Sequence, residues 1–462
     1  MAPVSVVVLA AGQGKRMNSA LPKVLQPLAG RPLLAHVVAA ARALKPDAIH
    51  VVYGHGGEDV RAAFAEEPDL KWALQAEQLG TGHAVMQAMP AISDEHRVLV
   101  LYGDVPLVRV ETLERLAAKG STGRLALLTA RLDDATGYGR VVRDARGAVE
   151  RIVEHNDATD DERRVNEINT GLIAFDAKAL RRYLGDLKSN NAQREYYLTD
   201  VIGMAVAERV QVDGIAAESP AEVLGINDRQ QLAAAERALQ RRQAADLMER
   251  GVTLADPERL DVRGEVIVGR DVFIDVGVVL EGKVVLGDRV RLEAYSVVRN
   301  CVLGADTVVH PFCHFESSTA GDDCEIGPFS RLRPGVVLSG HVKVGNFVEM
   351  KNSHVAPHAK VNHLTYVGDA TVGKGVNVGA GTITCNYDGE RKHPTIIEDG
   401  VFIGSDSQLI APVRIGRDAY VAAGSSITQD VPADALAIGR ARQDTKPGWA
   451  AKRRELRAEK KR

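Results

Sequence analysis

An aliphatic residue followed by glycine recurs through the second half of the chain, repeatedly at multiples of six residues, and this repeat constrains the fold more than any other feature. The pairs are Val268-Gly269, Leu286-Gly287, Ile326-Gly327, Val344-Gly345, Val372-Gly373, Val378-Gly379, Ile403-Gly404 and Ile415-Gly416. A six-residue period sustained over this length is typical of a parallel β-helix, in which each six supplies a short strand and a turn. The intervals 304–327 and 379–404 break the count, which predicts loops between coils.

The first half of the chain alternates apolar strands with helical stretches. The expected strands are 4–10, 49–53 and 98–101, and the expected helices are 32–44 and 82–89. This alternation predicts a doubly wound, Rossmann-like α/β domain with a parallel sheet and a ligand site at the carboxyl ends of its strands. A stretch without Gly or Pro then predicts a long helix. We therefore expect a nucleotide-binding domain at 1–227, a linker helix at 228–250 and a β-helix domain at 251–462 that ends in a basic tail.

Composition argues against several classes of function. The formal net charge is −3, and no apolar run reaches the roughly 18 residues of a membrane span, so we expect neither a nucleic-acid partner nor membrane insertion. The tail Lys452–Arg462 is basic but has no aromatic residues to stack on bases; binding of nucleic acid through it is an alternative that salt-sensitive retention on DNA would test. The cysteines Cys301, Cys313, Cys324 and Cys385 match no zinc spacing. We expect reduced thiols in a cytoplasmic protein, with zinc or a disulfide as the alternative.

Two motifs in the first half point to phosphate and metal chemistry. The segment Leu9-Ala10-Ala11-Gly12-Gln13-Gly14-Lys15-Arg16-Met17 follows the first expected strand. A glycine turn there lets backbone N–H groups approach a phosphate, and Arg16 and Lys23 would neutralise a departing pyrophosphate. Asp104 follows the strand 98–101, where a carboxylate suits a hard cation such as Mg²⁺. The alternatives are a tight strand–helix turn with solvated basic side chains, and a turn aspartate before Pro106.

The irregular segments of the repeat half carry the groups that acyl transfer needs. An amine that attacks a thioester needs a base, which His363 would supply. It also needs hydrogen-bond donors for the oxyanion, for which backbone N–H groups near Ala380 are suited. Arg333 and Lys351 would bind the phosphate of a sugar phosphate. Because His363 is one of 13 histidines, an ordinary surface histidine is the alternative.

Together these motifs resemble those of the sugar-1-phosphate nucleotidyltransferases. The similarity is greatest to the family of bifunctional N-acetylglucosamine-1-phosphate uridyltransferases and glucosamine-1-phosphate N-acetyltransferases, and it spans essentially the whole chain. The resemblance implies left-handed coiling, a homotrimer with sites between subunits, and Mg²⁺ for uridylyl transfer. It implies glucosamine 1-phosphate, acetyl-CoA and UTP as substrates, and a product used for peptidoglycan and lipopolysaccharide. The alternative is a single-function nucleotidyltransferase with a structural β-helix, against which His363, Tyr366 and Asn386-Tyr387 speak.

The resemblance also implies roles for individual residues. The uridine nucleotide would contact Leu9, Ala10, Ala11, Gly12, Lys23, Gln75, Gly80, Thr81, Tyr102, Gly103 and Asp104, the sugar would contact Gly139, Glu154 and Asn169, and Mg²⁺ would bind Asp104 and Asn227. Glucosamine 1-phosphate would contact Arg333, Lys351, Tyr366 and Asn377, with His363 as the base oriented by Glu349. Acetyl-CoA would contact Ala380, Asn386, Tyr387, Ser405, Ala423 and Arg440.

Some of these residues have simpler alternatives. Asn169 suits a turn, Glu154 a surface strand, and Asn227 the N-cap of the linker helix. Lys15 stands where the family has Thr, so a hydroxyl is lost and a charge gained, which leaves the handling of the triphosphate open.

Overall fold

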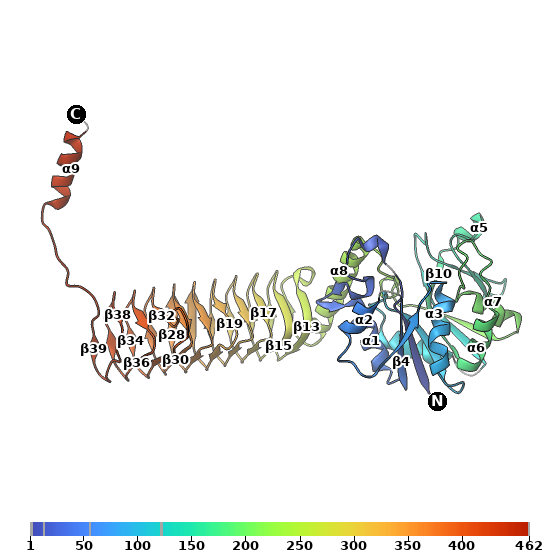
Figure 1. Cartoon of the computed structure of the whole chain (residues 1–462), viewed down its shortest axis with the longest axis horizontal. Coiled ribbons are helices and arrows are strands. Elements are labelled where there is room, and N and C mark those ends of the chain that lie inside the picture. Colours follow the sequence, from blue (N-terminus) through green and yellow to red (C-terminus); the bar gives the residue numbers. More distant parts are fainter. Residues whose placement is uncertain (1–2, 13, 55–56, 121–122, 461–462) are drawn as a thin grey trace. The chain divides into compact units, whose positions relative to one another are not determined.

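The chain folds into two compact units, 1–243 and 244–462 (Figure 1). The computed structural model describes residues 3–12, 14–54, 57–120 and 123–460. Gln13 of the glycine motif and the side chain of Lys15 lie outside this description. Among the helices described, none combines the length and apolar character needed to cross a membrane.

A mostly parallel sheet forms the centre of the first unit. Its main strands are β1 (Val4–Leu9), β4 (Ala48–Gly54), β5 (Leu70–Gln75), β6 (Arg97–Tyr102), β7 (Arg124–Arg131), β10 (Glu167–Asp176) and β11 (Gln211–Ala216). They lie in the order β11-β7-β10-β6-β1-β4-β5, and β1 is parallel to both of its neighbours. The expected strands β1, β4 and β6 are therefore confirmed.

Strand β10 departs from the expected parallel sheet, because it runs antiparallel to β6 and β7. The connection from β7 to β10 contains the hairpin of β8 (Arg140–Arg143) and β9 (Val149–Val153) and only the short helix α5 (Asp160–Arg163). A parallel return needs a longer crossover, usually a packed helix. The expectation of an all-parallel sheet was therefore wrong at this strand.

Helices cover both faces of the sheet, which confirms the doubly wound class. The helices are α1 (Leu33–Ala43), α2 (Glu58–Ala63), α3 (Thr81–Ala88), α4 (Val110–Lys119), α6 (Ala177–Asp186) and α7 (Asp200–Ala207). Side chains of α1 and α4 pack with Val6 and Val8 of β1. Side chains of α3, α6 and α7 pack with Val7 and Leu9 on the opposite face. The strict alternation of β1 between the two cores explains why its sequence is apolar from Val6 to Leu9.

The expected long helix is α8 (Arg229–Glu249). Its Leu239 is buried in the first unit with Leu28, Leu33 and Ile226. Its last turns, with Leu247, belong to the core of the second unit.

The second unit is a parallel β-helix whose coils have three sides. One coil holds β25 (Lys343–Asn346), β26 (Glu349–Lys351) and β27 (His354–Val355), and the next holds β28 (Lys360–His363), β29 (Tyr366–Gly368) and β30 (Ala370–Val372). In these coils the first strand joins an 11-stranded sheet, and the other two join a 17-stranded sheet. This stacking agrees with the left-handed β-helix of hexapeptide repeats expected from the sequence.

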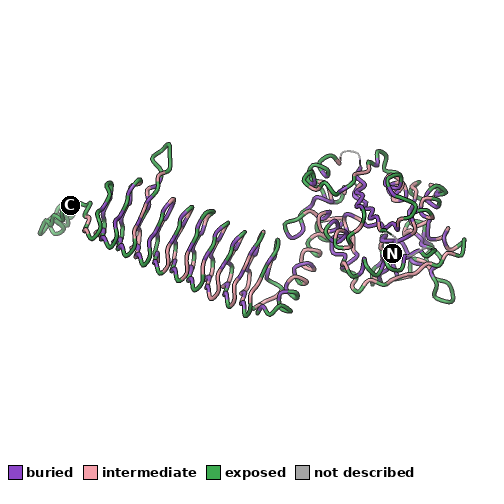
Figure 2. Tube along the Cα trace, turned by 90° about the horizontal axis from the view of Figure 1, so that it is seen from below, coloured by how far each residue is buried: buried purple, intermediate pink, exposed green. Residues whose placement is uncertain are grey.

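Packing inside the coils explains the aliphatic–glycine pairs. The aliphatic residues, such as Leu286 and Val344, form one continuous buried core. Figure 2 shows buried residues recurring in each coil. The glycine that follows meets the next coil. A Cβ built on Gly287 would lie only 2.6 Å from the backbone nitrogen of Ala305. Any larger residue would therefore push two coils apart.

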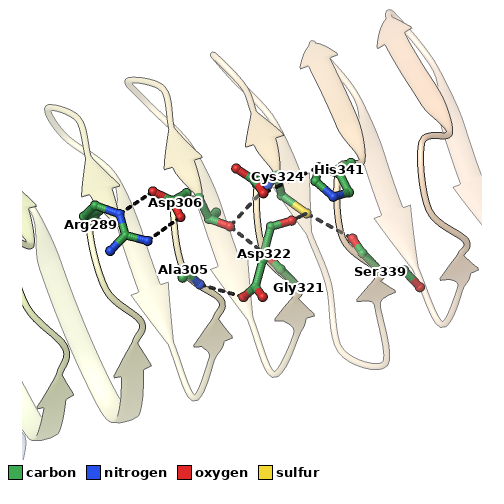
Figure 3. A network of polar contacts seen from close by, with 10 residues as sticks. Arg289, Ala305, Asp306, Gly321, Asp322, Cys324, Ser339 and His341 are labelled. Carbon is green, nitrogen blue, oxygen red and sulfur yellow. Dashed lines mark hydrogen bonds and ion pairs between the residues drawn. The ribbon is translucent and has the colours of Figure 1, made fainter.

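Polar contacts join successive coils at one corner of the β-helix (Figure 3). The guanidinium of Arg289 donates to both carboxylate oxygens of Asp306, at 2.6 and 2.7 Å, and holds the pKa of that carboxyl below its usual range. The backbone N–H of Ala305 donates to Asp322 at 2.8 Å, and the thiol of Cys324 donates to the carbonyl of Ser339 at 3.1 Å.

The four cysteines are free thiols, and Cys301, Cys313 and Cys324 are buried, whereas Cys385 is partly exposed. The expectation of reduced thiols agrees with this arrangement.

Candidate functional site

One cavity of about 310 Å³ opens at the carboxyl ends of β1, β5 and β6 in the first unit. Many residues expected to bind the nucleotide line it, namely Leu9, Ala10, Ala11, Gly12, Lys23, Gln75, Gly80, Thr81, Tyr102 and Asp104. Gly103, also expected there, donates its N–H to the carbonyl of Leu9 at 2.9 Å. The topology brings these segments together because parallel strands end at the same edge of the sheet.

Hydrogen bonds within the chain hold the walls of this cavity. The amide nitrogen of Gln75 donates to the carbonyl of Gly80 at 3.1 Å, and the hydroxyl of Thr81 accepts the N–H of Leu198 at 3.1 Å. Burial raises the pKa of Tyr102, so its hydroxyl stays protonated and can donate a hydrogen bond at neutral pH. The walls thus present fixed polar groups to a ligand.

The glycine turn after β1 places Lys23 at this cavity. Gly14 has a φ of +61°, and a Cβ on it would lie 2.5 Å from the Cβ of Lys23. Only glycine therefore allows the turn to pack against the stem of Lys23. Arg16 lies on the neighbouring 3-10 turn η1 (Lys15–Met17), where its side chain is exposed and has no hydrogen-bond partner within the described part of the chain.

Lys23 connects the two residues that the sequence suggests as metal ligands. Its ammonium forms a short ion pair with Asp104 and donates to the amide oxygen of Asn227 at 3.2 Å. The side chains of Lys23 and Asp104 are only 12% and 16% exposed. A carboxylate oxygen and an amide oxygen therefore converge on one positive charge, and such oxygens are the ligands that Mg²⁺ prefers. Within the described residues, no group of three or more His, Cys, Asp or Glu side chains forms a metal centre.

The residues expected to bind the sugar form a second group: Gly139 precedes β8, Glu154 follows β9, and Asn169 lies on β10. The N–H of Asn169 donates to the carbonyl of Gly139 at 2.8 Å. A carboxylate oxygen of Glu154 lies 3.3 Å from where a Cβ on Gly139 would stand. The other oxygen of Glu154 accepts the hydroxyl of Thr199 at 2.9 Å. Glu154 is thus a partly buried carboxylate, and burial raises its pKa.

This raised pKa predicts a cost in stability that Glu154→Gln should remove. A carboxyl whose pKa is higher in the folded state loses stability as the pH rises from its unfolded pKa through its folded pKa. At pH 8 the ionised carboxylate is therefore at its least favourable, and we expect the variant to melt about 1–4 °C higher than the wild type. Below about pH 3, where the carboxyl is protonated in both the folded and the unfolded state, the melting curves of the variant and the wild type should coincide. The exposed Glu150→Gln is the matched control; an equal rise in that variant would contradict a specific effect at Glu154.

In the β-helix, three cations gather beside one another. The guanidinium of Arg333 pairs with the carboxylate of Glu349 at 2.9 Å. The Lys392 ammonium beside Lys351, with Arg333 close by, lowers the pKa of Lys351. Cations that repel one another in this way form a site for an anion, such as a phosphate. Lys392 was not singled out from the sequence.

Lys392 lies in the loop that breaks the repeat count between β32 (Ile383–Cys385) and β33 (Thr395–Ile397). Tyr387 and Lys392 form an isolated antiparallel bridge across this loop. Asn386 at its base is buried and donates to the carboxylate of Asp369. The break in periodicity was therefore the available signal for Lys392, although it does not specify which residue of the loop points back to the site.

His363 and most of the residues expected to bind acetyl-CoA follow one corner of the β-helix. His363 is opposite Asn346 of the preceding coil, and the pairing of Lys360 with Asn377 places Ala380 in the same row. The pairings of Asn377 with Phe402 and of Phe402 with Tyr420 continue the row to Ser405 and Ala423. Arg440 follows near Gly424: its Cδ lies 3.7 Å from where a Cβ on that glycine would stand.

Two polar groups in this row are available to bind a ligand. The imidazole of His363 is exposed and has no hydrogen-bond partner among the described residues. The N–H of Ala380 likewise donates to no acceptor in the described part of the chain, although its carbonyl accepts Asp406 at 2.7 Å. An acceptor for a proton and a donor for an oxyanion therefore lie on adjacent coils.

Glu349 is the residue expected to orient His363. Its carboxylate pairs with Arg333 instead, and its strand neighbour on the next coil is Tyr366. A nearby guanidinium competes with an imidazole for the same carboxylate, and the charged pair is the stronger of the two.

Both units of the chain are similar to known proteins. Residues 6–197 match the family model of the MobA-like NTP transferase domain, 262–370 that of the GMPPB C-terminal domain, and 394–429 that of the bacterial transferase hexapeptide with six repeats. The chain is 58% identical over 446 residues to the protein named "Bifunctional protein GlmU" of Azoarcus sp. (strain BH72), covering 96% of this chain and 98% of that one. Proteins of the same name from Aromatoleum aromaticum and Herminiimonas arsenicoxydans are 58% and 53% identical over the same shares.

Proposed function

This chain belongs to the family of the bifunctional GlmU proteins, and we infer from that premise that it makes UDP-N-acetylglucosamine in two reactions. The β-helix unit acetylates glucosamine 1-phosphate with acetyl-CoA. The α/β unit then transfers UMP from UTP to N-acetylglucosamine 1-phosphate and releases pyrophosphate. The single observation that carries this inference is the similarity over the full length of both units, because a relative that shared one unit alone would support one activity.

Uridylyl transfer needs alignment and charge neutralisation rather than a protein base. An oxygen of the sugar phosphate forms a bond to the α-phosphorus of UTP while the bond from that phosphorus to the bridging oxygen breaks. We assign the sugar to Gly139, Glu154 and Asn169, which are joined by the contacts described above. Arg16 and Lys23 would neutralise the pyrophosphate as it leaves.

Asp104 and Asn227 would hold Mg²⁺ in this reaction. Their oxygens already converge on the ammonium of Lys23, so the donor set and its charge fit a hard cation. When bound, Mg²⁺ supplies a Lewis acid that neutralises charge on the phosphate oxygens.

Acetyl transfer uses the row that contains His363. The amine of glucosamine 1-phosphate attacks the thioester carbonyl of acetyl-CoA, and His363 takes the proton that the nitrogen loses. The N–H of Ala380 donates to the oxyanion, and the C–S bond then breaks to release CoA. Arg333, Lys351 and Lys392 would bind the sugar phosphate, with Tyr366 and Asn377 at the sugar. Acetyl-CoA would lie along Ala380, Asn386, Tyr387, Ser405, Ala423 and Arg440.

One assay separates this function from a nucleotidyltransferase with a purely structural β-helix. Glucosamine 1-phosphate, acetyl-CoA, UTP and Mg²⁺ are supplied together, and free thiol and pyrophosphate are followed separately. Both products should accumulate, with thiol first. A chelator should stop pyrophosphate release and leave thiol release unchanged, because nothing in the acetyl-transfer site requires an ion. Pyrophosphate release from added N-acetylglucosamine 1-phosphate without any thiol release would favour the single-function alternative.

We further propose that the chain acts as a homotrimer joined along one corner of the β-helix. This aromatic corner consists of Tyr295, Phe312, Phe329 and Phe347, whose side chains are 47–59% exposed. Neighbouring rings stack with centroids 5.0–5.5 Å apart. Leu364 continues the column, because the pairing of Asn346 with His363 sets it opposite Phe347. A column of apolar groups repeating once per coil is matched in spacing by another copy of the same β-helix, and so large an exposed patch is typical of an interface.

Charges placed in the aromatic corner should dissociate the trimer. We expect Phe312→Asp combined with Phe329→Asp to raise the dissociation constant at least about 100-fold, measured by light scattering after size exclusion. Val302→Asp, at an equally exposed position of β18 (Val302–Leu303) on another side of the coils, is the matched control. A trimer that survives the double substitution would exclude this corner as the interface.

We assign the reactions to the cytoplasm, where free thiols such as the four found here persist. The product would enter the synthesis of peptidoglycan and lipopolysaccharide.

A further inference from the structure

Lys23 occupies the point on which the two proposed metal ligands converge. We propose that the ammonium of Lys23 is the resident counter-ion of this site in the free enzyme. A divalent cation then binds tightly only when the ammonium of Lys23 leaves Asp104 and Asn227 and pairs with the phosphate of a bound ligand. The proposal rests on the assignment of Mg²⁺ to Asp104 and Asn227, and it adds that metal and nucleotide bind interdependently.

Hydrogen bonds within the chain fix the oxygens that face the ammonium. The amide nitrogen of Asn227 donates to the carbonyl of Gly225 at 3.3 Å, so its oxygen is the atom that points to Lys23. The backbone N–H of Asn227 donates to the side chain of Gln231 at 2.7 Å. The N–H of Ile226 donates to the carbonyl of Asp104 at 2.9 Å, which ties the two ligand segments together. The amide of Asn227 and the backbone of both ligand segments are therefore held by contacts that do not depend on the cation between them.

The charge balance of the site allows one cation at a time. Asp104 offers a single negative charge, which the ammonium of Lys23 already neutralises. The described residues supply no cluster of further acidic ligands there. A divalent cation added beside the ammonium would place three positive charges against one negative charge at low exposure, where screening by water is weak. The ammonium must therefore leave when the metal enters.

The freed ammonium has a defined destination. Lys23 lines the nucleotide cavity together with Gly12 and Thr81, and its stem is packed against Gly14. A rotation of the outer side chain would therefore bring the ammonium to the phosphates of a bound nucleotide. Because linkage is reciprocal, a phosphate that draws Lys23 away raises the affinity for the metal, and the metal raises the affinity for the phosphate by the same factor.

Mn²⁺ binding to the full-length protein, followed by electron paramagnetic resonance of the free ion, tests this proposal without any turnover. We expect Lys23→Met and Lys23→Gln to bind Mn²⁺ about 10- to 100-fold more tightly than the wild type in the absence of nucleotide, the range that corresponds to removing one charge-assisted contact. Adding UMP should tighten Mn²⁺ binding more in the wild type than in either variant. Circular dichroism verifies that the variants are folded.

Two controls distinguish the counter-ion role of Lys23 from a non-specific charge effect and from a wrong assignment of the metal site. Arg16→Met removes a nearby cation that contacts neither oxygen. If this variant gains as much affinity for Mn²⁺ as Lys23→Met, the gain is a non-specific electrostatic effect, and the role of Lys23 is overturned. Equal or weaker Mn²⁺ binding in both Lys23 variants would overturn it as well. If Lys23→Met binds Mn²⁺ tightly and adding Asp104→Asn leaves that binding unchanged, the assignment of the metal to Asp104 fails, and the counter-ion proposal fails with it.

Discussion

Asp104→Asn is expected to lower uridylyl transfer at least about 10³-fold and to leave acetyl transfer within about twofold. The amide keeps the shape of the side chain but removes the one carboxylate proposed to hold the metal, and stabilisation of the charge on phosphate oxygens supplies several kcal/mol of the barrier reduction. Pyrophosphate release measures the first effect and thiol release the second. The two rates separate because Asp104 belongs to the first unit and the row of His363 to the second.

The matched control is Asp133→Asn, an exposed aspartate of the same unit that should leave both rates unchanged. Loss of both activities in folded Asp104→Asn would contradict two independent sites. Retention of pyrophosphate release would remove Asp104 from the metal site.

Much of the fold was predictable because it follows from regular spacing of residue types along the sequence. The aliphatic–glycine pairs are enforced by close coil contacts of the kind seen at Gly287, so the repeat in the sequence and the repeat in space have one cause. The alternation of strands and helices in the first unit was likewise predictable from the pattern of apolar residues. The direction of β10 was not, because neither propensity nor pattern distinguishes a hairpin return from a helical crossover when the intervening segment is irregular.

Residues at the candidate sites divide in the same way. Positions at the ends of strands, such as Asp104, follow from topology. Contacts between residues far apart in the chain do not: the ammonium of Lys23 reaches a partner 204 residues away, and Lys392 reaches Lys351 from a loop outside the repeat. For Glu349 the sequence identified the residue but not its partner, because its ion pair with Arg333 depends on the distance between the two side chains in the folded chain.

His363→Ala should lower the rate of acetyl transfer about 10²- to 10⁴-fold with little change in the affinity for acetyl-CoA. The substrate amine is mostly protonated at neutral pH, and only its neutral form attacks a thioester. An imidazole beside the amine takes the proton as the tetrahedral intermediate forms, and general base catalysis contributes an effect of that size. Thiol release at saturating substrates gives the rate, and KM for acetyl-CoA reports binding. Pyrophosphate release from N-acetylglucosamine 1-phosphate should be unchanged.

Three further variants decide whether His363 acts as a base. His363→Asn keeps a polar side chain of similar size but cannot accept a proton near neutral pH, so it should be as slow as His363→Ala. Glu349→Gln should change the rate much less, because its carboxylate contacts Arg333 and not the imidazole. His354→Ala alters another exposed histidine of the same β-helix and should have no effect. A rate close to that of the wild type in His363→Asn would mean that the amine loses its proton directly to water, and the open imidazole would then be an ordinary surface side chain.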